Sequence, residues 1–171
     1  MVKSAPNCPY IEAHLKGGHQ RPSAIVLTLS DTTSSSGAAL GLANFWHKRN
    51  SKFDSCHYVV DESMTYQSIW DNQQACYSPK GAIAISLCAR RTMEHLEWEG
   101  PGSRRDALER AAGLIAALCK AHKIRPRILS IKDYQKWSNF KTKRRGGIFI
   151  TVEGVFSAPL LMALVEEHMK S

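Results

Sequence analysis

Histidines and cysteines, the residues that most often bind metal ions or act as nucleophiles, are scattered along this chain. The 171 residues include seven histidines and five cysteines. No two histidines are spaced as HxH or HxxxH, and no two cysteines as CxxC, so the sequence lacks the short motifs that are typical of zinc sites. Cys76, beside Tyr77, is a candidate ligand or nucleophile, but the sequence shows no basic partner that would activate its thiol.

The cysteines and tryptophans are expected to have mainly a packing role. The odd number and wide spacing of the cysteines indicate reduced, mostly buried thiols, with one or two disulfide bonds as the alternative. The tryptophans are expected in the core or at its rim, with the lining of a glycan groove as the alternative. The residues concerned are Cys8, Cys56, Cys76, Cys88 and Cys119, and Trp46, Trp70, Trp98 and Trp137.

Positive charge is concentrated in the second half of the chain. The net charge is +8, and residues 101–146 contain thirteen Lys or Arg against three Asp or Glu. The densest run, a candidate binding surface, comprises Lys141, Lys143, Arg144 and Arg145. Such a run attracts anionic cell-wall polymers or acidic partner surfaces, or is simply a solvated surface. Few aromatic residues interrupt it, which makes nucleic acid an unlikely partner.

Neither a membrane span nor a secretory signal is expected. No apolar run approaches the roughly 20 residues that cross a bilayer, and the first residues lack the apolar block of a signal peptide. We therefore expect a protein that does not bind a membrane.

Strand and helix patterns alternate along the chain, which predicts an α/β domain. The apolar run 24–29 and the run 82–88 read as buried strands, and 56–61 with 65–69 reads as a hairpin. An apolar stripe at helical spacing predicts a long helix over 103–123, which Ser103 could cap. Further elements are expected at 38–48 (helix), 128–131 (extended), 132–137 (helical turn), 148–152 (strand) and from Ser157 and Pro159 onward (helix). We predict a single domain, 1–171, with a central mixed sheet flanked by helices.

The order of several short motifs resembles one enzyme family. Residues 55–61, SCHYVVD, are similar to a family strand SAHYVVD; residues 75–78, ACYS, fall where the family has AWHA; and 144–148, RRGGI, resembles the segment before its last strand. Over residues 22–157 the chain thus resembles the phage type-2 N-acetylmuramoyl-L-alanine amidases, endolysins that share their fold with peptidoglycan recognition proteins. The resemblance implies an amidase type 2-like fold and a catalytic zinc with three protein ligands and a water.

The positions that the resemblance assigns to the site carry the wrong residues for that chemistry. Thr28 and Tyr77 stand where the family has zinc-binding histidines, and Ser86 where it has an acidic residue. The histidine of the last strand falls near Thr151 or Val152, and the loop with the last ligand is missing before residue 159. A hydroxyl cannot replace imidazole toward zinc. We therefore predict a degenerate site at Thr28, Tyr77, Ser86 and Thr151, with no zinc and no catalytic residues, and His57 as a core histidine.

These observations leave several functions open. The favoured one is a catalytically inactive, amidase-like phage protein that is reused in the virion, as a capsid decoration or tail component, with other virion proteins as partners and a possible homo-oligomeric state. The alternatives are a non-catalytic binder of peptidoglycan or an anionic cell-wall polymer, and an active endolysin with a rearranged site in the host cytoplasm. A fold alone does not decide among them.

Overall fold

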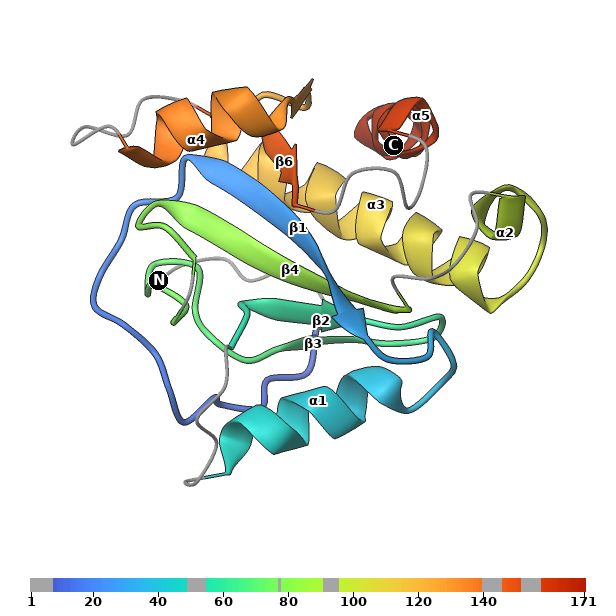
Figure 1. Ribbon diagram of the computed structural model, residues 1–171, viewed down its shortest axis with the longest axis horizontal. Coiled ribbons are helices and arrows are strands. Elements are labelled where there is room, and N and C mark those ends of the chain that lie inside the picture. Colours follow the sequence, from blue (N-terminus) through green and yellow to red (C-terminus); the bar gives the residue numbers. More distant parts are fainter. Residues whose placement is uncertain (1–7, 49–54, 77, 91–95, 140–145, 152–157) are drawn as a thin grey trace.

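The computed structural model describes residues 8–48, 55–76, 78–90, 96–139, 146–151 and 158–171 (Figure 1). Its strands form one sheet in the order β3-β2-β4-β1-β6-β5. The strands are β1 (Ala24–Asp31), β2 (Tyr58–Val60), β3 (Thr65–Gln67), β4 (Ala82–Ala89), β5 (Ile128–Leu129) and β6 (Ile148–Ile150). The helices are α1 (Ala38–His47), α2 (Leu96–Glu99), α3 (Ser103–His122), α4 (Ile131–Asn139) and α5 (Ala158–Met169).

The centre of the sheet is parallel and its β3 edge is antiparallel. β1 pairs in parallel with β4 and with β6, and β4 with β2, while β2 and β3 form the predicted hairpin. All eight residues of β4 are buried, as expected of a central strand that is covered on both faces. The predicted α/β class with a mixed central sheet is thus confirmed.

Alternate residues of the central strands face two different layers of helices. Ile25, Leu27 and Leu29 of β1 pack in one cluster with Leu108 and Ile115 of α3, a cluster that also includes residues of α5. On the opposite face α1 packs Ala43 and Trp46 against Val59 and Ala84, and α4 packs Trp137 near Val26 and Phe149. In Figure 1, α3 runs behind β1, and α5 lies beside α3.

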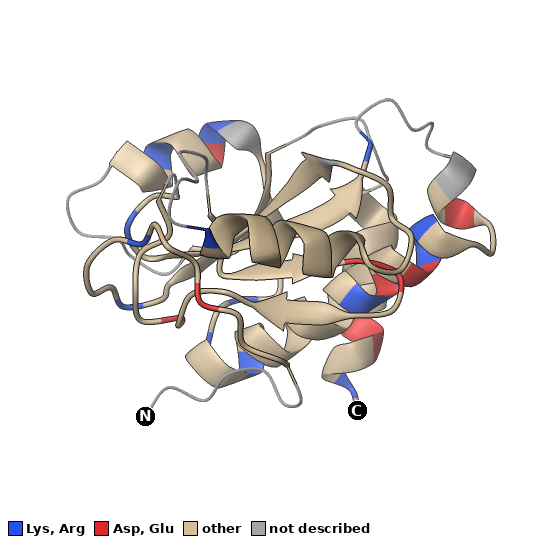
Figure 2. Cartoon of the chain, turned by 90° about the horizontal axis from the view of Figure 1, so that it is seen from below, with Lys and Arg blue, Asp and Glu red and all other residues tan. Residues whose placement is uncertain are grey.

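The outward side of α1 is free of charge. No Lys, Arg, Asp or Glu occurs between Ala38 and His47, and Figure 2 shows this helix uncoloured across the front of the molecule. Leu40 and Phe45 are exposed there. Among the described residues no helix is both long and apolar enough to cross a membrane.

Two helix starts differ from expectation. Ser103 is the first residue of α3 rather than its cap; Gly102, at φ 150°, occupies the cap position, and the Ser103 hydroxyl lies 2.9 Å from that of Ser34. Glycine reaches this φ without steric cost, so the chain turns into α3 one residue earlier. α4 begins at Ile131, because Ser130 and Asp133 form a reciprocal capping box. Ser157 and Val152 lie outside the described residues.

Backbone crowding explains the paired glycines before β6. A Cβ on Gly147 would lie 2.6 Å from the carbonyl oxygen of Arg127, and one on Gly146 would lie 2.9 Å from the Cβ of Ala24. Ile148 N–H donates to that same Arg127 oxygen at 2.9 Å, so β5 cannot retreat without losing the hydrogen bond.

We expect Gly147→Ala to lower the free energy of unfolding by about 1–3 kcal/mol, the usual cost of forcing extra atoms into a packed site. Gly41→Ala is the matched control, because a Cβ there meets nothing within 4 Å on the outside of α1; it should stabilise the helix by about 0.5–1 kcal/mol. Urea titration of both variants measures the difference, and equal stability of Gly147→Ala and the parent chain would contradict the crowding.

Candidate functional site

Thr28 and Ser86 lie side by side in the middle of the sheet. The parallel register of β1 and β4 pairs these two residues directly. Both side chains belong to the face that carries Val26 and Ala84, opposite the α3 layer. Thr28 is half-buried and Ser86 is only 3% exposed. Two positions that the sequence assigned to one site are therefore neighbours.

Thr151 joins the same region from the other side of β1. It follows the end of β6, and its N–H donates to the carbonyl oxygen of Leu27 at 3.0 Å. Its hydroxyl approaches the same oxygen at 3.4 Å, and the residue is exposed. Tyr77 lies outside the described residues, so its predicted convergence with Thr28 and Thr151 in a groove stays a prediction.

Further hydroxyls and one thiol continue this strip toward the carboxyl end of β1. The Ser30 hydroxyl lies 3.3 Å from the carbonyl oxygen of Leu87 and 3.2 Å from the hydroxyl of Thr32. Burial raises the pKa of the Cys88 thiol, and hydrogen bonds with the Ser30 and Thr32 hydroxyls offset only part of this rise. The thiol is therefore protonated at neutral pH. We name the group of hydroxyls formed by Thr28, Ser30, Thr32, Ser86 and Thr151 the hydroxyl strip, and Cys88 lies beside it, paired with Ser30.

The hydroxyl strip does not fit a zinc ion. Zinc in proteins is held by imidazole, thiolate or carboxylate groups, whereas Thr28, Ser86 and Thr151 offer neutral hydroxyls. In the part of the chain that the structure describes, no three residues among His, Cys, Asp and Glu stand close enough to share a metal ion. The donor chemistry at these three positions thus disagrees with the zinc that the resemblance implies, and the predicted absence of the metal stays a prediction.

His57 is a structural histidine, as the sequence indicated. It is fully buried, and both ring nitrogens are engaged: Nδ1 accepts from Ala84 N–H at 2.9 Å, and Nε2 lies 2.6 Å from the carbonyl oxygen of Gln73, to which it donates. This partner set fixes the Nε2-protonated neutral tautomer. The Gln20 amide, 3.2 Å away, directs its own hydrogens to the carbonyl oxygens of Asp71 and Ala82. No lone pair of His57 is left for a metal.

The sequence did not reveal a buried polar cluster around Asp71. This carboxylate is inaccessible to solvent and accepts hydrogen bonds from Tyr58 Oη at 2.8 Å and from His122 Nε2 at 2.8 Å. It ties the end of α3 to the segment after β3. Nothing in the sequence spacing signals this contact, because 51 residues separate Asp71 from His122.

Burial and the nearby charge of Asp71 raise the pKa of the Cys8 thiol to about 12, so Cys8 is no nucleophile.

The remaining sequence predictions have mixed outcomes. Cys56, Cys88 and Cys119 are buried, Cys8 is half-buried and Cys76 is exposed, and no two of these sulfurs are bonded. Three of the four tryptophans are buried, whereas Trp70 is 40% exposed and stacks on Tyr10 with ring centroids 4.1 Å apart. The proposed binding residues Lys141, Lys143, Arg144 and Arg145 all lie outside the described residues.

The buried imidazole predicts acid sensitivity. Burial lowers the pKa of His57 below its usual 6.5, although the Gln73 bond and the charge of Asp71 partly oppose this. The unfolded chain therefore takes up a proton near pH 6.5 that the folded chain refuses, and the free energy of unfolding falls as the pH drops below that value. The slope for one proton is at most about 1.4 kcal/mol per pH unit.

Urea titrations from about pH 7.5 down to about 5.5 test this, because His57→Gln should show a flatter profile than the parent chain. His14→Gln, at an exposed position, is the control. NMR of the parent chain should show the Nε2-protonated tautomer even where the variant folds poorly. A profile in His57→Gln as steep as that of the parent would exclude His57 as the cause.

Comparison with known proteins places the fold. No protein-family model and no curated protein sequence match this chain. Among solved structures, the catalytic domain of XlyA superimposes with a TM-score of 0.61 at 16% identity, covering 96% of this chain and 97% of that domain. The Staphylococcus aureus hydrolase AmiA gives 0.61 at 14% identity, covering 98% and 85%. PlyL gives 0.59 at 12% identity, covering 95% and 96%.

A shorter match, over 70% of this chain and 79% of the other, is an endolysin mutant from Bacillus subtilis, with a TM-score of 0.57 at 20% identity. Identities this low establish the fold alone. The chain therefore has the architecture of the endolysin and amidase catalytic domains, as the order of its sequence motifs predicted.

Proposed function

We propose that this chain is a catalytically inactive, amidase-like protein that serves as a structural component of a phage particle, such as a capsid decoration or tail protein. The observation that carries the proposal is the hydroxyl strip. Zinc-dependent amide hydrolysis needs an ion that lowers the pKa of a bound water and polarises the carbonyl. Thr28, Ser86 and Thr151 supply neither the ligands for that ion nor an acid or base.

Three other reactive groups, Cys8, Cys88 and His57, do not supply an alternative mechanism. A nucleophilic cysteine needs a lowered pKa and a base within hydrogen-bond reach. Burial raises the pKa of Cys88, and that of Cys8 reaches about 12. His57, which directly precedes β2, has both ring nitrogens committed to backbone groups. The side chains around the strip therefore favour a protein without hydrolytic activity.

The assignment to a phage particle rests on the likeness of fold. The sequence resembles phage amidases, and one solved structure with this fold is an endolysin. A scaffold that no longer holds its metal can still present a rigid surface, because its stability comes from the core between the sheet and α3 rather than from the site. The second candidate, a cell-wall binder, is favoured by the net charge of +8, since wall polymers are anionic.

We expect the purified protein to retain less than about a tenth of an equivalent of zinc after dialysis, because hydroxyl groups bind zinc weakly, and to release no fragments from purified peptidoglycan. Metal analysis by mass spectrometry and chromatography of the digest provide the readouts. An active zinc amidase run in parallel is the positive control. Stoichiometric zinc together with chelator-sensitive fragment release would overturn the proposal.

The two non-catalytic roles make opposite predictions for where the protein is found. For a virion component, quantitative mass spectrometry of purified phage particles should detect many copies per particle, and purified walls should retain little protein at moderate salt, where surface charge is screened. Absence from particles combined with salt-resistant retention on walls would replace the first role by the second.

A further inference from the structure

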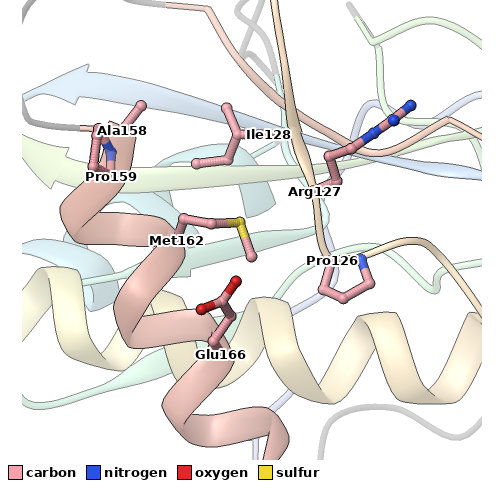
Figure 3. A pocket seen from close by; sticks show the side chains of 7 residues that line it. All are labelled: Pro126, Arg127, Ile128, Ala158, Pro159, Met162 and Glu166. Carbon is pink, nitrogen blue, oxygen red and sulfur yellow. The ribbon is translucent and has the colours of Figure 1, made fainter.

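A groove opens between the outer strand of the sheet and the last helix (Figure 3). It has a volume of about 510 Å³, within the range of sites that bind small ligands or side chains. Its apolar lining comes from two segments that are far apart in the sequence: Pro126 and Ile128 around β5, and Pro159 and Met162 on α5. Ile128 and Met162 are half-buried, so apolar surface remains accessible at the bottom of the groove.

The groove is electrically polarised. Arg127 stands at the β5 side, where Figure 3 shows its guanidinium directed away from α5, and Glu166 stands on α5 beside Met162. Lys123 and Arg125 precede Arg127 closely in the sequence, outside the lining of the groove, and all three cations are exposed. No ion pair links any of the three to a carboxylate in the described part of the chain. The β5 side of the groove is therefore positive and the α5 side negative, and the carboxylate of Asp133 on α4 also interacts electrostatically with Arg127.

β5 contributes side chains rather than backbone to this surface. It is the last strand of the sheet in the described part of the chain, so one edge of β5 has no partner strand among those residues. The strand has only two residues, and Pro126 just before it has no N–H. Addition of a long partner strand would gain few hydrogen bonds here. An occupant must instead be recognised by its apolar side chains and its charges.

We propose that this groove binds an acidic peptide segment of a partner protein, with one or two apolar side chains on Ile128 and Met162 and a carboxylate against Arg127. The flexible thioether of Met162 suits such a surface, because it adapts to differently shaped side chains. A uniform polyanion such as DNA or a wall polymer fits less well. It has no apolar side chain for the groove, and it would meet the carboxylate of Glu166. The inference does not depend on whether the fold is catalytically active.

The test uses a fluorescein-labelled peptide of three glutamates, a leucine, a phenylalanine and a lysine, with fluorescence anisotropy as the readout. The first comparison needs no protein variant. A peptide of the same charge, with serines in place of leucine and phenylalanine, should bind at least about tenfold more weakly, because it leaves the apolar surface in water. Equal affinity of the two peptides would overturn the proposal.

Protein variants then locate the site. Arg127→Glu and Met162→Gln should each weaken binding of the acidic peptide by about fivefold or more, the former mainly at low salt. Lys80→Glu is the matched control, an exposed cation just before β4, three strands from β5, and it should leave binding unchanged. Circular dichroism confirms that each variant folds. An unchanged affinity in Arg127→Glu would refute the site, and so would a DNA duplex that binds more tightly than the peptide through Arg127.

Discussion

The parallel pairing of β1 with β4 determines most of what this molecule can do. Eight residues of each strand are in register, and all eight of β4 are buried. A slip by one residue would move Ile83, Ile85 and Leu87 out of the α3 layer and turn Ser86 toward it. The core therefore fixes the register, and the register in turn places Thr28 beside Ser86. The composition of the candidate site is inseparable from the packing on the other face of the sheet.

The burial of position 86 favours a serine there over a carboxylate. The resemblance places an acidic residue there, and Ser86 is only 3% exposed; a carboxylate at a buried position is costly unless a cation or several hydrogen-bond donors compensate it. In a site whose neighbours are Thr28 and Cys88, no cationic group is provided. Serine needs no countercharge and can bond to nearby backbone. A site without metal ligands and a serine in place of the carboxylate would thus be mutually consistent under the proposed function, since each removes the reason for the other.

Local sequence patterns predicted the strands and helices, but not the contacts between residues that are distant in the sequence. Alternation and β-branched residues were sufficient to find β1, β4 and the hairpin, and the apolar stripe found α3. The start of α3 was wrong, because the sequence does not show that Gly102 would take a positive φ and leave the Ser103 hydroxyl to Ser34. The Asp71–His122 contact and the groove beside β5 join residues thirty or more positions apart, and single-sequence spacing carries no information on such pairs.

The hydroxyl strip and the polarised groove are also independent of each other. Thr28 lies on the α1 and α4 face of β1, whereas Ile128 packs with the cluster on the α3 face. Two strand steps, of about 5 Å each, separate β1 from β5. Substitutions this far apart, without shared partners, contribute additively. A chain can therefore lose the chemistry at the strip while selection retains or refines a binding surface at the groove, and neither change constrains the other.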